Sequence, residues 1–277
     1  HDRDNWEDHS RFSLIWTHDT GYTPHDRWEQ QPVASGDRWQ LLFIGYLSHR
    51  DDLARELAVP LPEAERMPDS ALVMRAWERW GEQCASRLYG RFAFAVCDTR
   101  LLTLFAYRSI ERGPNIYVHQ DDARIVVTTS TKPIFCDPSV PREIDEVRVA
   151  DALVLNHEDR RRSFFRGVEI VPSGHVLRAN PDDCTMAQHY FLERVPDIRF
   201  ARDEDYVEAA RELLGRAVTS AMRACQTPAI SLSAGLDSTT VAVTMLEEMA
   251  AGRAGHDLPL KAFTSVPAPF WDGRSRP

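Results

Sequence analysis

Residues 228–266 constrain the fold of this chain more than any other segment. They begin with a short apolar stretch, which a turn of small residues follows. Apolar residues then recur at helical spacing up to about Ala251, and a second apolar stretch covers 258–266. This order predicts a strand-helix-strand unit with parallel strands. Two parallel strands with one covered face do not form a stable sheet alone. We therefore expect a larger parallel sheet that the 277 residues leave unfinished.

The turn in this unit reads Ser233-Ala234-Gly235-Leu236-Asp237-Ser238. Gly235 lets backbone N–H groups approach an anion, and the amino end of the following helix adds partial positive charge. The two serine hydroxyls are donors, and Asp237 can hold Mg²⁺ against phosphates. The lysine and spacing of a Walker A loop are missing, which disfavours transfer of a γ-phosphate. In the plainer alternative, Gly235 makes a tight turn and Asp237 and Ser238 cap the helix.

The rest of the chain alternates helical and strand patterns. Four apolar stretches within residues 90–130 predict an antiparallel meander, and helices are predicted at 51–58, 69–81, 147–155 and 203–224. Asp69 is predicted to cap the second of these helices. The predicted apolar side of the last helix comprises Tyr206, Val207, Ala210, Leu213, Leu214, Ala217 and Val218. A change of pattern predicts two domains, 1–194 and 195–277.

Composition excludes several classes of protein. Hydrophobic residues make up 43% and charged residues 27%, which is typical of globular chains. The 42 acidic residues exceed the 33 lysines and arginines, so nucleic acid is not an expected partner. No apolar stretch approaches the roughly 20 residues that span a bilayer. Five scattered cysteines without a Cys-x-x-Cys spacing predict reduced thiols in a cytoplasmic protein.

The hexapeptide resembles the pyrophosphate loop of the asparagine synthetase family, Ser-Gly-Gly-Leu-Asp-Ser, with Ala234 in place of the first glycine. Further stretches resemble family motifs in the family's order and extend the resemblance over nearly the whole chain. They are residues 90–98, 128–132, 165–168, 172–175 and 189–191. The family includes β-lactam synthetase and lasso-peptide cyclase relatives.

The resemblance implies an α+β N-terminal nucleophile-hydrolase-like sandwich of antiparallel sheets over 1–194, a class II glutamine amidotransferase-like domain. Over 195–277 it implies the first β-α-β unit of an α/β adenine-nucleotide α-hydrolase-like parallel sheet. The implied ligands are ATP and Mg²⁺, the latter on Asp237. The implied ATP-binding residues are Leu232, Ser233, Gly235, Leu236, Asp237, Ser238 and Ser265.

Residues 1–194 depart from the family at the implied site of glutamine hydrolysis. The family's nucleophile is an amino-terminal cysteine, whereas residue 1 here is histidine. Ile44 stands where the family has an oxyanion-binding asparagine, and loss of such a donor lowers rates by about 10²–10³. Gly45 and Asp69 are the remnants of the glutamine site, with Asp69 a candidate ligand for an amine. We therefore expect no catalytic residue for glutamine hydrolysis.

Three functions remain open at this point. The first is an ATP-dependent ligase that adenylates a small-molecule or peptide carboxylate, releases pyrophosphate and lets ammonia or an amine attack. The second is a cyclase of the lasso-peptide or β-lactam type, which uses an amine of its own substrate. The third is a non-catalytic, truncated remnant or scaffold, because the family's later catalytic residues would lie beyond residue 277. Neither nucleic acid nor membrane is expected as a partner, and a homodimer is one assembly open to the chain.

Overall fold

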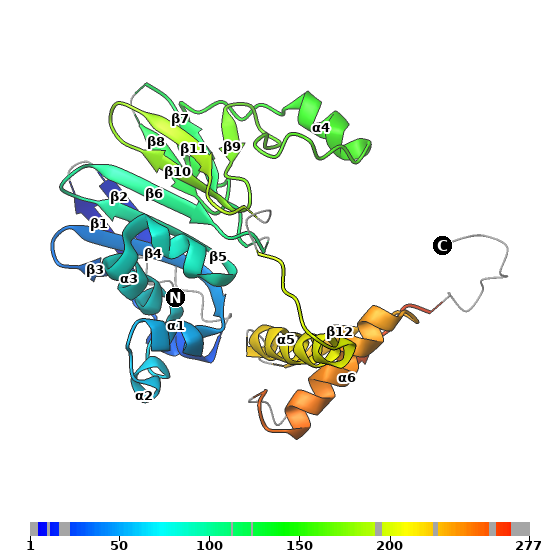
Figure 1. The fold of residues 1–277 in the computed structure, drawn as a ribbon. Helices are drawn as coiled ribbons and strands as arrows, with labels where there is room; N and C mark the ends of the chain where they lie inside the picture. Colours follow the sequence, from blue (N-terminus) through cyan, green and yellow to red (C-terminus); the bar gives the residue numbers. More distant parts are fainter. Residues whose placement is uncertain are drawn as a thin grey trace. The chain divides into compact units, whose positions relative to one another are not determined.

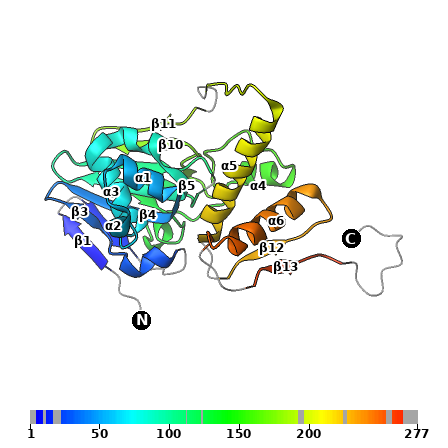
Figure 2. The same ribbon diagram turned by 60° about the horizontal axis from the view of Figure 1, so that its bottom comes forward.

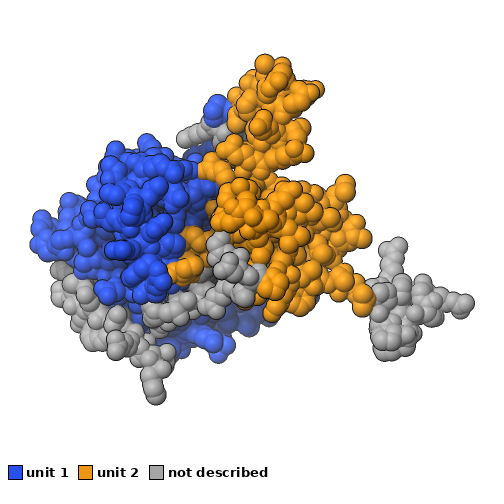
Figure 3. All heavy atoms as spheres, turned by 90° about the horizontal axis from the view of Figure 1, so that it is seen from below, with its two compact units in different colours: residues 1–20, 25–196 blue, residues 21–24, 197–277 orange. Residues whose placement is uncertain are grey.

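The computed structural model of the chain describes residues 5–9, 12–16, 23–111, 113–122, 124–191, 196–223, 227–254 and 259–266. It divides the chain into two compact units, coloured separately in Figure 3. Unit 1 comprises residues 1–20 and 25–196, and unit 2 comprises residues 21–24 and 197–277. None of the described helices is long and apolar enough to cross a membrane.

The larger sheet of unit 1 has six antiparallel strands in the order β11-β10-β6-β5-β4-β3 (Figure 1). Their bounds are β3 Val33–Ser35, β4 Trp39–Ser48, β5 Tyr89–Asp98, β6 Thr103–Arg108, β10 His175–Ala179 and β11 Cys184–Gln188. The central strands β4 and β5 pair along their full length, from Trp39 opposite Asp98 to Ser48 opposite Tyr89. This long apolar pair is the scaffold on which both faces of the unit are built.

A smaller antiparallel sheet of unit 1 has the order β8-β7-β9. Its strands are β7 Tyr117–Gln120, β8 Ile125–Thr128 and β9 Val168–Ile170, and a separate ribbon pairs β1 Asn5–His9 with β2 Phe12–Trp16. The predicted single meander over residues 90–130 is therefore wrong, because β6 pairs with β10 and β7 with β9. The change of sheet buries apolar side chains of both strands, Ala106 and Val118, in one cluster.

Helices cover the face of the large sheet that is turned away from the small one. They are α1 Arg50–Glu56, α2 Leu61–Ala64, α3 Asp69–Trp80 and the short helix η2 Gly81–Arg87, with η1 Pro24–Trp28, η3 Ile134–Cys136 and α4 Glu146–Leu153 elsewhere in unit 1. Leu72 and Trp77 of α3 join Phe43 and Phe92 of the sheet in the main core. The opposite sheet face packs on the small sheet. Unit 1 is thus the predicted α+β sandwich of antiparallel sheets.

Unit 2 contains α5 Asp203–Arg223, β12 Ala229–Ser231, α6 Leu236–Ala250 and β13 Lys261–Phe263 (Figure 2). The two strands are parallel, with Ile230 opposite Ala262, as predicted. Val218 of α5 and Met245 of α6 lie in one buried cluster. The predicted apolar side of α5 is only partly covered by the described residues, since Leu213 remains 60% exposed. Leu214, Val218 and Met222 of α5 lie in the cluster with residues of α6, whereas Leu213 lies outside that cluster.

Candidate functional site

The small-residue loop of unit 2 lies between β12 and α6. The Leu232 N–H donates to the Phe263 carbonyl oxygen at 2.7 Å, which carries the strand pairing up to the loop. Gly235 is the N-cap of α6, with φ −86° and ψ 155°. A first helical hydrogen bond runs from the Thr239 N–H to the Gly235 carbonyl at 3.4 Å. The N–H groups before it in the first turn therefore point out of the helix without an intrahelical acceptor.

Ser238 braces this loop through its hydroxyl group. Its Oγ accepts from the Ser233 N–H at 3.2 Å and lies 3.0 Å from the Ser233 carbonyl oxygen. The Ser233 and Ser238 hydroxyl oxygens are also 3.2 Å apart. Capping by Asp237 and Ser238 is therefore the wrong description, because Gly235 is the N-cap and Ser238 ties the two ends of the loop together. The geometry brings the two predicted serines side by side.

Asp237 lies in the first turn of α6 and is exposed, as are Ser233, Gly235 and Leu236. Mg²⁺ is commonly held by one or two carboxylates together with phosphate oxygens and water. Among the described residues no cluster of three metal-ligating side chains occurs. A single exposed carboxylate beside unsatisfied N–H groups fits a magnesium ion that arrives with phosphates, and it does not fit a metal held by protein ligands alone.

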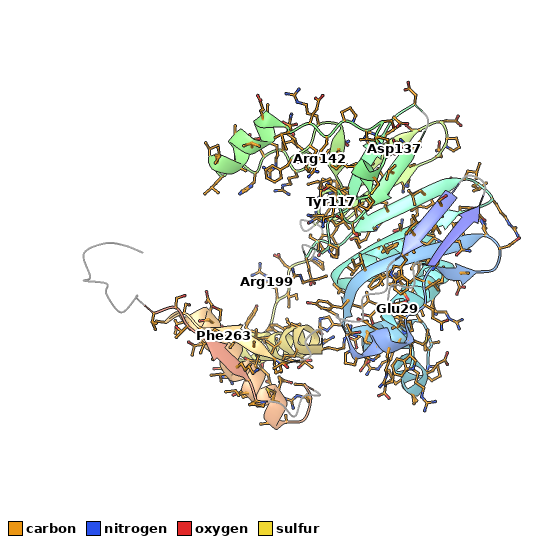
Figure 4. The ribbon with its side chains drawn as sticks, turned by 180° about the vertical axis from the view of Figure 1, so that it is seen from behind. Glu29, Tyr117, Asp137, Arg142, Arg199 and Phe263 are labelled. Atoms are coloured by element: carbon orange, nitrogen blue, oxygen red, sulfur yellow. The ribbon has the colours of Figure 1, made fainter. Side chains whose placement is uncertain are left out.

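The remaining predicted nucleotide residues lie around the same edge of unit 2. Leu232 directly follows β12, and the exposed Ser265 comes two residues after β13. Because the strands are parallel, their carboxyl ends meet at the edge that carries the loop. Large apolar side chains stand exposed there, Phe263 (Figure 4) at 62% and Leu236 at 85%.

Ile44 and Gly45 of unit 1 lie within β4, opposite Ala93 and Phe92 of β5. Ile44 is half-buried against the cluster between the two sheets. Gly45 has φ +108°, and a Cβ atom there would lie 2.1 Å from the Arg91 carbonyl oxygen. The backbone therefore requires glycine at this position whatever the site binds.

Asp69 has a structural task that the sequence did not indicate. Its Oδ1 pairs with Nη1 of Arg50 at 2.5 Å, and its Oδ2 accepts from the Leu47 N–H at 2.7 Å. The N-cap of α3 is Pro68, so the predicted capping role of Asp69 is wrong. Both Arg50 and Asp69 are buried, and the arginine also donates to carbonyl oxygens of Ala64 and Met67. Both carboxylate oxygens therefore stabilise the connection between the end of β4 and the helices that follow it.

Glu29 lies beside this connection, and sequence reasoning missed it (Figure 4). Its carboxylate accepts from the Ser70 hydroxyl at 2.5 Å. Burial, and to a smaller extent Asp26 and Asp69, raise the pKa of Glu29 to about 7 against the lowering effect of hydrogen bonds. Nearby, Gln31 is held to β4 by two hydrogen bonds with the Phe43 backbone, at 2.8 and 2.6 Å. In the sequence, Glu29 is marked only as an acidic residue that precedes Gln31-Pro32. Acidic residues near a proline are too common for this to identify a functional residue.

The described cysteines form no disulfide, and two of them, Cys84 and Cys97, are poorly suited to act as nucleophiles. Cys84 and Cys97 are buried, and burial raises the pKa of each thiol to about 12. A thiol with so high a pKa carries almost no thiolate at neutral pH. Cys225 lies outside the described residues.

Comparison with known sequences gives two family matches. Residues 8–191 match the family model for a glutamine amidotransferase domain, and residues 209–272 match that for asparagine synthase. Asparagine synthetase (glutamine-hydrolyzing) 3 of Bacillus subtilis (strain 168) is 24% identical over 216 residues, which cover 76% of this chain and 35% of that protein. Amidase chyE of Penicillium rubens is 27% identical over 250 residues, covering 88% of this chain and 35% of that protein.

The chain therefore spans about a third of the length of these curated relatives. Among solved structures, a glutamine phosphoribosylpyrophosphate amidotransferase from B. subtilis aligns with a TM-score of 0.36 and 16% identity. The alignment covers 84% of this chain and 48% of that one. A TM-score this low does not establish a common fold by itself.

Proposed function

The chain belongs to the asparagine synthetase family, and we propose that it is an ATP-dependent, amide-forming ligase. The observation that supports this most is the exposed loop of unit 2, where a strand end, a glycine N-cap and the first turn of α6 present N–H groups beside Asp237. Such an arrangement suits the phosphates of a nucleotide. Leu232, Leu236 and Ser265 would then lie near the rest of the nucleotide.

In the proposed reaction a carboxylate oxygen attacks the α-phosphorus of ATP. The bond to the bridging oxygen breaks, and pyrophosphate leaves. An amine then attacks the acyl carbon, AMP departs with the electron pair, and the amine loses a proton. The loop N–H groups and Ser233 would hold the leaving pyrophosphate. Asp237 would bind the magnesium ion, whose charge offsets that of the phosphates.

We further propose that unit 1 does not hydrolyse glutamine. Ile44 offers no hydrogen-bond donor to an oxyanion, and both oxygens of Asp69 are engaged by Arg50 and Leu47. The attacking nitrogen would then come from free ammonia or from an amine. These two observations favour a cyclase-like reaction, with the amine on the same substrate as the carboxylate, as the second candidate.

The test is exchange of radiolabelled pyrophosphate into ATP by the full chain, with a panel of amino-acid and peptide carboxylates. Exchange that depends on one carboxylate class, and that Asp237→Asn abolishes, is the expected result. Release of glutamate from glutamine would contradict the proposal for unit 1. Absence both of exchange and of stabilisation by Mg-ATP would instead favour the scaffold alternative.

A further inference from the structure

Helix α4 of unit 1 exposes the apolar side chains that a surface helix normally buries. None of its residues is buried. Figure 1 shows the helix beyond β9, at one end of unit 1. Five large apolar side chains within the helix and directly after it are between 36 and 80% exposed: Val147, Val149, Leu153, Val154 and Leu155. We call these five residues the α4 face.

The polar side of α4 holds the helix to the rest of unit 1. Arg148 is only partly exposed, and its guanidinium lies 5.1 Å from the centre of the Phe164 ring. The buried N-cap residue, Asp145, accepts from the Arg148 N–H at 3.1 Å and pairs with Nη1 of Arg162 at 3.0 Å. The Asp145 N–H donates to the Phe164 carbonyl oxygen at 3.0 Å. The helix is therefore fixed in place without any contribution from the α4 face.

The α4 face has about the apolar area that one partner contributes to a protein–protein interface. Val149 and Leu153 are four residues apart, and Val147 and Val154 are seven apart, so these side chains lie along one side of the helix. At their exposures they form a patch of a few hundred Å², the largest that ordinary monomers expose. A standard interface takes about 800 Å² from each partner, of which a little more than half is apolar.

The distribution of charge favours a second copy of this chain as the partner. The whole chain carries a net charge of −9, so two copies repel each other over most of their surface. Residues 142–166, which contain α4, hold six arginines and six acidic residues, and therefore no net charge. Two acidic chains can meet at a neutral segment without that repulsion. A neutral segment also gives no attraction for nucleic acid or for an anionic membrane.

The order of residues along α4 is self-complementary. Ala150 is exposed in the middle of the helix, with Val147 three residues before it and Leu153 three residues after it. Consider two copies of the helix that run antiparallel about a two-fold axis near Ala150. Val147 of each copy then lies opposite Leu153 of the other, as the symmetry of an isologous contact requires. The small side chain of Ala150 lets the two helix axes approach closely.

We propose that α4 is a homodimer contact, in which two copies of this chain pack their α4 faces antiparallel across a two-fold axis. The contact removes the exposed apolar side chains from water. Unit 1 has cores of its own on both faces of the large sheet, so each copy stays folded when the contact is lost. The inference concerns unit 1 and does not depend on nucleotide binding by unit 2.

Sedimentation equilibrium of the full chain, from about 1 to 100 μM, measures the contact. We expect the wild type to dimerise reversibly. Leu153→Glu places two like charges in the contact and should raise the dimer Kd at least about thirtyfold. The matched control is Leu101→Glu, which adds the same charge at a leucine that is 65% exposed in the turn between β5 and β6. This control should dimerise like the wild type, and chemical denaturation should give all three proteins similar stability.

A mixture of two variants tests the antiparallel pairing itself. Val147→Lys alone should lose the dimer, as Leu153→Glu does. Mixed in equal amounts, the two variants should form a dimer with one copy of each. In that dimer the introduced amine faces the introduced carboxylate, and the remaining leucine faces the remaining valine.

Four results would overturn the proposal. The wild type stays monomeric over the whole concentration range, or Leu153→Glu dimerises as the wild type does. Leu101→Glu weakens the dimer as much as Leu153→Glu, which would indicate unspecific apolar association. The mixture of Val147→Lys with Leu153→Glu stays monomeric. A monomeric wild type that sediments with phosphatidylcholine vesicles would assign the α4 face to a lipid surface in place of a second copy.

Discussion

The glutamine-site remnant of unit 1 and the loop of unit 2 each contain an aspartate that the sequence marks as a ligand. Asp69 is buried, and both of its oxygens hold the protein's own groups, Arg50 and the Leu47 N–H. Asp237 is exposed, and its side chain makes no hydrogen bond with the described residues. An aspartate serves a ligand only where the fold leaves its oxygens uncommitted. Asp69 therefore has a structural role, and Asp237 is the aspartate whose carboxylate is open to a ligand.

The largest effect that this comparison predicts is a loss of stability when Asp69 is replaced. Asp69→Ala removes the carboxylate that pairs with the buried Arg50 guanidinium, so we expect the free energy of unfolding to fall by about 3–5 kcal/mol. Urea denaturation of the chain measures it. The matched control is Asp52→Ala, which removes an exposed partner of Arg55 and should cost about 0.5 kcal/mol or less. A loss below about 1 kcal/mol at Asp69 would show that the pair is not structural.

Gly45→Ala tests the second remnant of the glutamine site. The added Cβ would meet the Arg91 carbonyl oxygen at 2.1 Å while φ stays positive. We expect a loss of at least about 2–3 kcal/mol. In Gly36→Ala the backbone also has positive φ, but no atom lies within 4 Å of the new Cβ. That control should lose only about 1 kcal/mol, and equal losses at both glycines would rule out the close approach as the cause.

The partly buried carboxyl group of Glu29, beside Asp69, should make the free energy of unfolding depend on pH. Its pKa is raised in the folded chain to about 7 from 4.5. Its contribution to the free energy of unfolding is therefore complete below pH 4.5 and is lost as the pH rises through 7. Glu29→Gln removes this loss, so the variant should gain roughly 2 kcal/mol on the wild type between acidic and mildly alkaline pH. Chemical denaturation at a series of pH values measures the difference, and a difference independent of pH would contradict the raised pKa.

Asp237→Asn should show the smallest effect on stability and a large one on binding. The side chain is exposed, so the free energy of unfolding should change by no more than about 0.5 kcal/mol. Stabilisation by Mg-ATP, read as a rise in Tm, should be lost. A variant that keeps the full rise would remove Asp237 from the site.

Much of the fold could be predicted because local pattern and tertiary structure agree. The strand over β4, helix α3 with its end at Gly81, and the parallel unit around α6 all follow apolar period and turn residues. The pairing of β6 with β10 could not be predicted, because strand partners are set by which apolar faces meet across the sandwich. Only the folded chain shows that.

The candidate sites were predictable to different degrees for a related reason. The loop of unit 2 is a contiguous motif, so its residues are adjacent in the sequence. Arg50 and Asp69 are 19 residues apart. Contacts at such separations leave no local signal. The sequence therefore does not indicate that these charged side chains lie inside the fold.

We propose that phosphates bind at the loop of unit 2 and that no nucleotide binds at the glutamine-site remnant of unit 1. Titration of the isotope-labelled chain with Mg-ATP, followed through its backbone amide resonances, tests both halves together. We predict saturable shifts of the amides of residues 233–238, with those of Gly45 and Asp69 unmoved. Shifts confined to unit 1, or none in the loop at saturating nucleotide, would contradict the account.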